Sequence, residues 1–123
     1  MVVVDTNVLV DVLRGRPEAV AALEAHAGDE VVIPSMVRFE VLAGARPPEL
    51  AAISSLLEAC LDGPVDRLVA ERASELARRY ARSNTGIDPI DYVVAATAQL
   101  LDATLLTRNV KHFPMFARLR PPY

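Results

Sequence analysis

The sequence is poor in several features that mark particular classes of protein. Its one cysteine, Cys60, has no partner for an internal disulfide, which favours a reducing compartment. No apolar run approaches the roughly 20 residues that a membrane span needs. No basic stretch precedes an apolar segment at the N-terminus, so no signal peptide is expected. These absences predict a cytoplasmic protein without a membrane anchor.

Positive charge and aromatic side chains are also scarce. The 123 residues carry a formal net charge of −3, and only 5% of them are aromatic. A chain of this composition does not bind nucleic acid through bulk positive charge or through extended stacking of bases on exposed rings. The composition still allows an enzyme in which bound metal ions supply positive charge locally.

Hydrophobic residues, by contrast, make up 52% of the chain, enough for one core and a single domain over residues 1–123. Short apolar strands alternate with helices, which predicts an α/β fold, a three-layer α/β/α sandwich with a mostly parallel central sheet. N-caps are predicted at Ser35, Asp66 and Asp88, and the proline-rich end is expected to be frayed. Strands are predicted at 2–4, 30–33 and 104–107, and helices at 7–14, 17–27, 36–43, 47–61, 67–82 and 89–101, with a helical turn within 111–116.

Three acidic residues lie where a carboxylate is unexpected. Asp5 ends the apolar run Met1–Val4, which is typical of a strand buried on both faces. Ligands collect at this end of parallel strands, and an unpaired charge at the rim of a core is costly. Glu40 interrupts an apolar helix face. Asp91 lies in the first turn of its helix, where a purely structural role is equally open because the helix N-terminus stabilises a carboxylate.

Taken together, Asp5, Glu40 and Asp91 indicate a divalent cation. Three carboxylates at one rim repel one another and raise one another's pKa values. A cation such as Mg²⁺, which prefers oxygen ligands, removes that penalty, and metal-bound water can attack a phosphodiester. The spacing in the sequence does not by itself show that the three side chains converge, so their convergence is a hypothesis for the structure.

Four ordered motifs resemble those of PIN-domain ribonucleases, specifically the VapC-type toxins of type II toxin–antitoxin systems. MVVVDTNVLVDVLRG resembles the first motif, IPSMVRFEVLAGA the second, and DYVVAATAQLLDATLLTRNVKHF the third and fourth, over residues 1–116. The tripeptide DTN alone is weak evidence for this family, whereas the four motifs in this order are specific for it. The resemblance implies a PIN fold and a Mg²⁺- or Mn²⁺-dependent endoribonuclease that hydrolyses RNA with metal-activated water. It also implies a cognate antitoxin that folds over the active-site groove, and a homodimer.

The resemblance also assigns roles to individual residues. It makes Asp5, Glu40 and Asp91 the catalytic, metal-binding acids, and it places Asn109 at a fourth position where family members carry Asp or Asn. Because Asn109 is neutral, we expect weaker binding of a second metal ion or contact through water. The residues expected to support this site from behind, chiefly by side-chain hydrogen bonds to Asp5, are Thr6, Asn7 and Thr107.

Several charged residues near the fourth motif are candidate contacts to RNA. Arg108 and Lys111 flank Asn109 and are the predicted phosphate contacts, in preference to the arginines of the 67–82 helix, which suit a solvated face. His112 is expected to be solvated.

Other charged residues are expected to form surface ion pairs. Asp11 is expected to pair with Arg14, and Glu75 with Arg78 or Arg79.

Two other functions stay open from the residues alone. A phosphoacceptor receiver domain also gathers carboxylates around Mg²⁺ and uses a Thr and a Lys from late strands, which Thr107 and Lys111 would match. Such a domain has a pair of acids after its first strand, whereas Asp5 is followed by Thr6 and Asn7. The second alternative is a degenerate relative that binds RNA or protein without catalysis, and the intact acidic triad argues against it.

Overall fold

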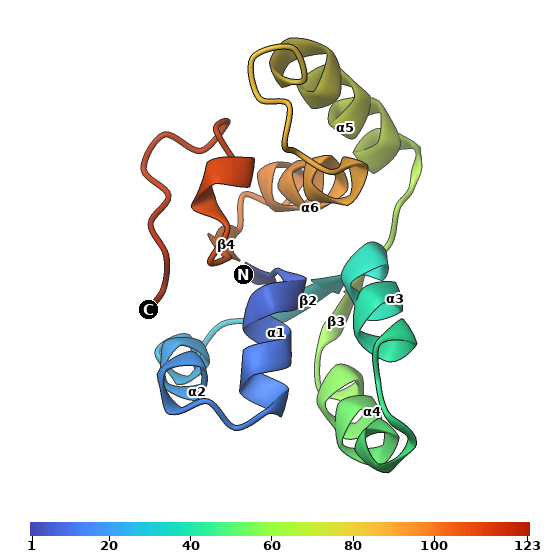
Figure 1. Ribbon diagram of the computed structural model, residues 1–123, viewed down its shortest axis with the longest axis vertical. Helices are drawn as coiled ribbons and strands as arrows, with labels where there is room; N and C mark the ends of the chain where they lie inside the picture. The colour runs from blue at the N-terminus through green and yellow to red at the C-terminus, as the bar shows by residue number, and fades with distance from the viewer.

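The computed structural model describes residues 1–123 as a parallel four-stranded sheet with helices on both faces (Figure 1). The spatial order of the strands is β3-β2-β1-β4, and every neighbouring pair is parallel. The strands are β1 (Val2–Val4), β2 (Val31–Pro34), β3 (Leu61–Gly63) and β4 (Thr104–Leu106). The helices are α1 (Thr6–Leu13), α2 (Pro17–Glu24), α3 (Ser35–Ala43), α4 (Leu50–Glu58), α5 (Arg67–Tyr80) and α6 (Pro89–Leu100), with short 3₁₀ turns η1 (Pro47–Glu49) and η2 (Val110–His112).

The predicted three-layer arrangement is confirmed. Figure 1 shows α5 and α6 on one side of the sheet and α1 to α4 on the other. None of these helices is both long and apolar enough to cross a membrane. Strands β1, β2 and β4 lie where the sequence predicts them, within a residue at each end.

Strand β3 was not predicted, and the helix predicted over 47–61 is wrong at both ends. Leu61, Asp62 and Gly63 carry no β-branched side chain, and the first two are exposed. They form a strand because they pair with Val32, Ile33 and Pro34 of β2 at the edge of the sheet, which is a tertiary effect. The predicted helix is divided accordingly into η1, α4 and β3.

The predicted N-caps have different outcomes. The Asp66 and Asp88 side chains accept hydrogen bonds from the backbone N–H groups of Val69 and Ile90, at 2.9 and 2.8 Å, so both caps are confirmed. Ser35 is not an N-cap. It is the first residue of α3, and its hydroxyl donates to the Gly63 carbonyl oxygen at 3.4 Å, which ties α3 to the edge strand.

One surface pair and the chain end also differ from expectation. Glu75 pairs with Arg72, at 3.5 Å, rather than with Arg78 or Arg79. The C-terminal segment is not frayed, because the phenol of Tyr123 donates a hydrogen bond of 2.7 Å to Asp11 in α1.

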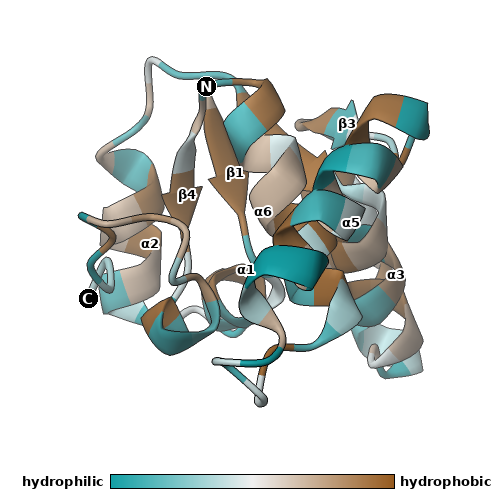
Figure 2. Ribbon diagram, turned by 90° about the horizontal axis from the view of Figure 1, so that it is seen from above, coloured by the Kyte–Doolittle hydropathy of each residue, from teal (hydrophilic) through white to brown (hydrophobic).

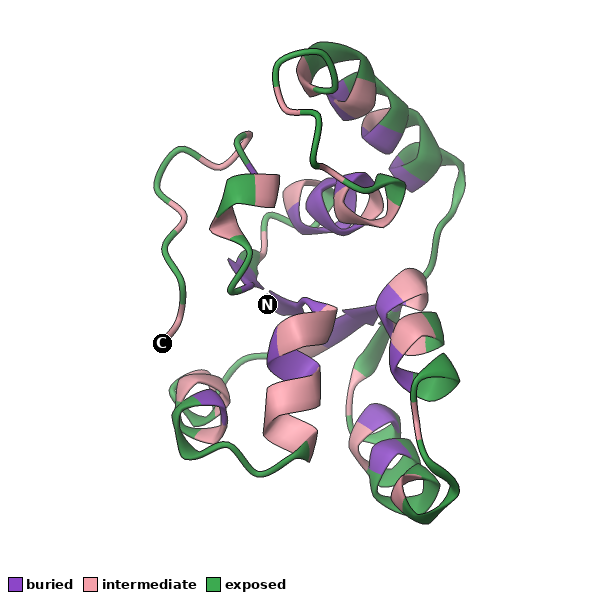
Figure 3. Cartoon of the chain, in the orientation of Figure 1, coloured by how far each residue is buried: buried purple, intermediate pink, exposed green.

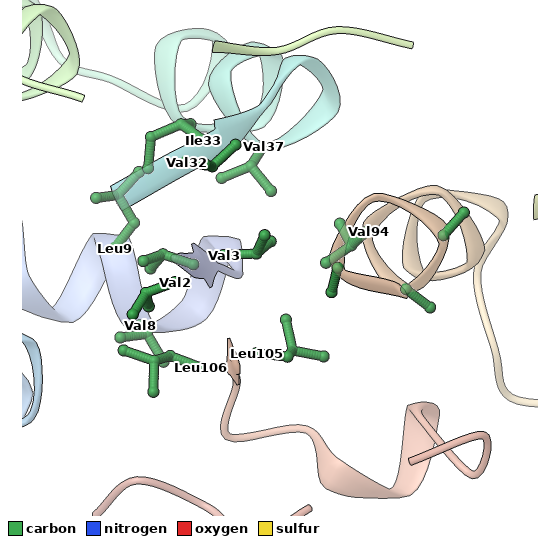
Figure 4. Close-up of a cluster of buried hydrophobic side chains, with 14 of the residues drawn as sticks. Val2, Val3, Val8, Leu9, Val32, Ile33, Val37, Val94, Leu105 and Leu106 are labelled. Carbon is green, nitrogen blue, oxygen red and sulfur yellow. The ribbon is translucent and has the colours of Figure 1, made fainter. Parts of the chain in front are cut away.

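The core lies between the sheet and the two helical layers. Residues Val2–Val4 are completely buried, and Figure 4 shows Val3 and Leu105 facing Val94 of α6, with Leu106 beside Val8 of α1. Small residues in α6 allow its close approach to the sheet. Buried residues gather on strands β1, β2 and β4 and on α6, whereas exposed residues gather on the outer helices (Figure 3). Strand β1 is uniformly hydrophobic, and α5 is largely hydrophilic (Figure 2).

This topology determines where a ligand site can form. The helices that follow β1 cover one face of the sheet, whereas α6, which leads into β4, covers the other face (Figure 1). The connection out of β1 and the connection into the neighbouring strand β4 therefore lie on opposite faces of the sheet. Crevices at the carboxyl ends of such strands are the usual ligand sites of open α/β sheets, and the residues that follow these two strands are Asp5 and Thr107.

Candidate active site

Asp5 lies at the centre of the candidate site, directly after β1. It is 4% exposed, and its backbone N–H donates to the Leu106 carbonyl oxygen of β4 at 2.9 Å. Its Oδ1 accepts a 2.8 Å hydrogen bond from the Thr6 backbone N–H and so caps α1. Its Oδ2 accepts from the hydroxyl of Thr107 at 2.7 Å and from the amide of Asn7 at 3.2 Å. The carboxylate is thus held by neutral donors alone.

Thr107 connects the ends of β1 and β4. This residue is completely buried, and while its hydroxyl donates to Asp5 it accepts from the backbone N–H of Asn109 at 3.0 Å. Asn7 also approaches the Thr107 hydroxyl, at 3.4 Å. The predicted hydrogen bonds from Asn7 and Thr107 are therefore present, and they fix Asp5 in one orientation. The side chain of Asn109 is exposed.

Glu40 reaches the site through Thr6. The Thr6 hydroxyl donates a 2.7 Å hydrogen bond to Glu40 Oε1, while the Thr6 backbone N–H donates to Asp5. The expectation of a Thr6 side-chain bond to Asp5 is therefore wrong, because that hydroxyl serves Glu40 instead. One residue thus links two of the three acids, and Glu40 Oε2 accepts no hydrogen bond from the protein.

Asp91 lies at the start of α6 and forms a capping box with Asp88. Its Oδ2 accepts from the Asp88 backbone N–H at 3.1 Å. The same oxygen lies 3.0 Å from Nδ1 of His112, so the expectation of a merely solvated His112 is wrong. His112 is the last residue of η2, and no local pattern in the sequence predicts its contact with Asp91, which lies 21 residues earlier in the chain. Oδ1 of Asp91 remains without a protein donor.

No arginine forms an ion pair with Asp5 or Asp91, and the pKa values of both carboxylates are raised. Burial raises the pKa of Asp5, the charge of Asp91 adds to the increase, and the bonds from Thr107, Thr6 and Asn7 oppose it. Burial likewise raises the pKa of Asp91, opposed by the Asp88 N–H and by His112. Asp5 and Asp91 are therefore close enough to repel.

The donor set suits a hard divalent cation. The site offers carboxylate oxygens, two of which have no protein donor, and Mg²⁺ typically takes one or two carboxylates and completes its shell with water. No three His, Cys, Asp or Glu side chains lie close enough to form a preassembled all-protein cage. The residues therefore fit a partly hydrated cation rather than one enclosed by protein ligands.

The two predicted phosphate contacts differ in how they are held. The Arg108 backbone N–H donates to Asn7 Oδ1 at 3.0 Å, and its guanidinium donates to Asp11 at 2.9 Å. Asp11 pairs with Arg108 and with Arg16, at 3.2 Å, so the expected pair with Arg14 is wrong. Lys111 is exposed on η2.

A cleft of about 520 Å³ lies between α1, α3 and the η1–α4 segment. Glu40 lies on its wall. Half of its lining is hydrophobic, with the charged side chains of Arg14, Arg46 and Glu49 alongside. The cleft therefore offers apolar surface together with side chains of both charges.

Comparison with known proteins matches nearly the whole chain to one family. The family model of the PIN domain matches residues 2–119. The chain belongs to the PIN-domain family. This PIN domain is 47% identical to ribonuclease VapC19 of Mycobacterium tuberculosis over the full length of both chains. It is 38% identical to ribonuclease VapC10 of the same organism, covering all of this chain and 93% of the relative.

The solved structures lead to the same family. This PIN domain matches a chain of a toxin–antitoxin complex from Klebsiella pneumoniae with a TM-score of 0.87 and 31% identity, covering all of this chain and 98% of that one. A match of this quality over both full chains identifies it as a VapC-type PIN domain and confirms the resemblance of its four motifs. The receiver-domain alternative is wrong.

Proposed function

We propose that this PIN domain is a Mg²⁺- or Mn²⁺-dependent endoribonuclease, the toxin of a cytoplasmic toxin–antitoxin pair. Its full-length relatives at 47% and 38% identity are named ribonucleases. The observation that carries the proposal is Asp5: a buried carboxylate at the carboxyl end of the central strand, held by neutral donors and repelled by Asp91. Such a group is costly unless a cation neutralises it.

The acids would hold the cation rather than transfer protons. Asp5 and Asp91 are the proposed direct ligands, with Glu40 as a third ligand or as the partner of a bound water, and Asn109 as a weaker fourth contact. When bound, a divalent cation supplies a Lewis acid for the phosphoryl group and lowers the pKa of an attacking water. Thr107, Asn7 and Thr6 keep the carboxylates in place, as supporting residues commonly do for metal ligands.

The test is RNA cleavage by protein purified free of any antitoxin. We expect cleavage with Mg²⁺ or Mn²⁺, none with excess EDTA, and recovery when the metal is restored. The Asp5→Asn chain, purified in the same way, controls for a contaminating nuclease. Cleavage that survives metal removal, or that Asp5→Asn retains, contradicts the proposal.

The proposed partner is a cognate antitoxin that covers the cleft beside Glu40. The similar chain of known structure comes from a toxin–antitoxin complex, and the half-hydrophobic lining of the cleft suits an apolar segment of a partner protein. The product of the neighbouring gene is the first candidate. Added to the purified toxin, it is expected to suppress RNA cleavage, and a product that binds without suppressing cleavage contradicts this assignment.

A homodimer is also proposed. Large apolar side chains are exposed on α3 and around β3 and the C-terminal end of α6, namely Phe39, Leu42, Leu61, Leu100 and Leu101, and such residues mark interaction surfaces when they gather. Light scattering after gel filtration is expected to give twice the 13.3 kDa chain mass. A mass of one chain across the micromolar range would contradict the dimer.

A further inference from the structure

Asp11 lies at the centre of a second polar cluster, close to the site but not part of it. Its Oδ2 accepts hydrogen bonds from three donors: Tyr123 at 2.7 Å, Arg108 at 2.9 Å and Arg16 at 3.2 Å. The three donors come from the C-terminal segment, the segment after β4 and the α1–α2 loop. One carboxylate of α1 therefore joins the loop that follows this helix to two segments near the C-terminus.

The Tyr123 ring contributes a second kind of contact. The guanidinium carbons of Arg16 and Arg108 lie 5.1 and 5.8 Å from its centroid, within the range of cation–π attraction. The ring thus restrains both arginines while its hydroxyl binds the acid between them. Because two guanidinium groups share one Asp11 carboxylate, the cluster retains donors for a further anion.

Arg108 is the member of this cluster whose backbone is bonded to a residue of the candidate site, Asn7. A guanidinium has five N–H donors, and Arg108 directs only Nη1 to a protein acceptor, Asp11. Its side chain is 43% exposed, whereas that of Asp11 is 14% exposed. Its backbone is fixed by Asn7, which also binds Asp5. Arg108 is therefore anchored next to the acids with most of its donors unused.

We propose that Tyr123 and Asp11 are positioning residues that hold Arg108 ready to bind a phosphate of the RNA backbone. The inference deepens the proposed function and rests on it for the identity of the substrate. An anionic substrate must approach an acidic site, and a fixed guanidinium at the rim offsets that repulsion. Restraining the long Arg108 side chain before binding also removes an entropic cost of ordering it in the complex.

The test is a double-mutant cycle between Arg108 and Tyr123. Affinity for a fluorescently labelled single-stranded RNA is measured in EDTA on the Asp5→Asn chain, so that the RNA stays intact. Arg108→Ala is expected to weaken binding about tenfold, the scale of a charge-assisted hydrogen bond, and to reduce the log–log salt slope by about 0.7. Tyr123→Ala is expected to weaken binding by about threefold to tenfold.

The combination distinguishes positioning from a merely structural role. The Arg108→Ala/Tyr123→Ala double variant is expected to bind RNA no more weakly than Arg108→Ala, because Tyr123 acts only through that arginine. Tyr123→Phe keeps the ring between the guanidiniums and is expected to retain more affinity than Tyr123→Ala. Arg67→Ala, which removes an equally positive but more exposed side chain at the N-terminal end of α5, is expected to change affinity less than twofold.

Cleavage kinetics separate this inference from the proposed function. In the otherwise unaltered chain with Mg²⁺, both single variants are expected to raise KM and leave kcat within about twofold. Strictly additive losses of affinity, or a Tyr123→Ala chain that melts lower yet binds RNA as before, would overturn the positioning role. If RNA binding follows the cycle but no metal-dependent cleavage is found, the proposed function fails while the role of Tyr123 stands.

Discussion

Asp5, the N-cap of α1, and Asp11, further along the same helix, have opposite environments. Asp5 is buried, is held by neutral donors, and has a pKa raised by burial and by Asp91. Asp11 lies near the surface, and its hydrogen bond from Tyr123 and the charges of Arg108 and Arg16 lower its pKa. The protein itself neutralises Asp11, whereas at Asp5 it fixes the geometry and leaves the charge uncompensated. That difference distinguishes a structural acid from one suited to bind a cation.

The largest expected effect is on activity, at Asp5. Asp5→Asn is expected to reduce RNA cleavage by about 1000-fold or more, because a metal ligand supports several kcal/mol of transition-state stabilisation. The metal-free variant is expected to be as stable as the wild type or more stable, since like-charge repulsion with Asp91 is relieved. Thermal melts with and without Mg²⁺ check both statements: the wild type gains stability with Mg²⁺ and the variant gains less. A variant that melts much lower without metal would make Asp5 a structural residue.

A smaller effect is expected from the hydroxyl that supports Asp5. Thr107→Val preserves the shape of a completely buried side chain but removes the 2.7 Å hydrogen bond to Asp5. Metal affinity, measured by Mn²⁺ titration, is expected to fall by about 10- to 100-fold. Thr97→Val is the matched control, because the buried Thr97 hydroxyl bonds only to the Val93 carbonyl oxygen, at 2.9 Å. Equal losses of Mn²⁺ affinity in the two variants would show that altered packing, and not the loss of the hydrogen bond to Asp5, is responsible.

Removing the acid of the second cluster is expected to have the opposite effect on stability. Asp11→Ala leaves three donors without their shared acceptor, and we expect the free energy of unfolding to fall by about 1–3 kcal/mol. Mn²⁺ affinity is expected to stay unchanged, because this acid does not face the cation. Chemical denaturation checks the loss of stability, and Mn²⁺ titration of the same preparation checks the unchanged metal affinity. An Asp11→Ala chain that is more stable than the wild type would invalidate the contrast with Asp5.

The smallest expected effect concerns pH. Burial and the bond to Asp11 raise the pKa of Tyr123 to about 12. The contribution of the Tyr123 phenol to the free energy of unfolding is therefore complete below the ordinary tyrosine pKa of about 10, and it is lost as the pH rises towards 12. Because the pKa of Asp11 is lowered, the contribution of its carboxylate to the free energy of unfolding is present above about pH 4 and is lost on acidification. The stability advantage of the wild type over Tyr123→Phe should therefore be constant from about pH 5 to 9 and shrink by pH 11. A difference that grows at pH 11 would contradict this assignment.

Much of the fold is readable from local sequence, and the exceptions have a common cause. The run Val2–Val4 and the Asp88-Pro89 helix start are local patterns, and both appear in the structure as predicted. Strand β3 is not readable because its three residues have no strand pattern of their own and form a strand only by pairing with β2. Edge strands of this kind depend on tertiary context.

The same difference between local patterns and tertiary contacts holds within the candidate site. The motifs gave the residues around Asp5, and the bonds from Asn7 and Thr107 are present although Thr107 is 102 residues away. The contacts of His112 with Asp91 and of Tyr123 with Asp11 were not predicted, because His112 was expected to be solvated and Tyr123 lies in a proline-rich end that was expected to be frayed. Contacts between segments 21 and 112 residues apart leave no periodic signal in the sequence.

The central claim is that Asp5, Glu40 and Asp91 together bind one divalent cation, and Mn²⁺ titration followed by electron paramagnetic resonance tests it most directly. The wild type is expected to bind Mn²⁺, and Asp5→Asn, Glu40→Gln and Asp91→Asn are each expected to weaken binding at least about tenfold, while Asp11→Asn binds as the wild type does. A wild type that binds no Mn²⁺, or an Asp91→Asn chain that binds it undiminished, would contradict the account.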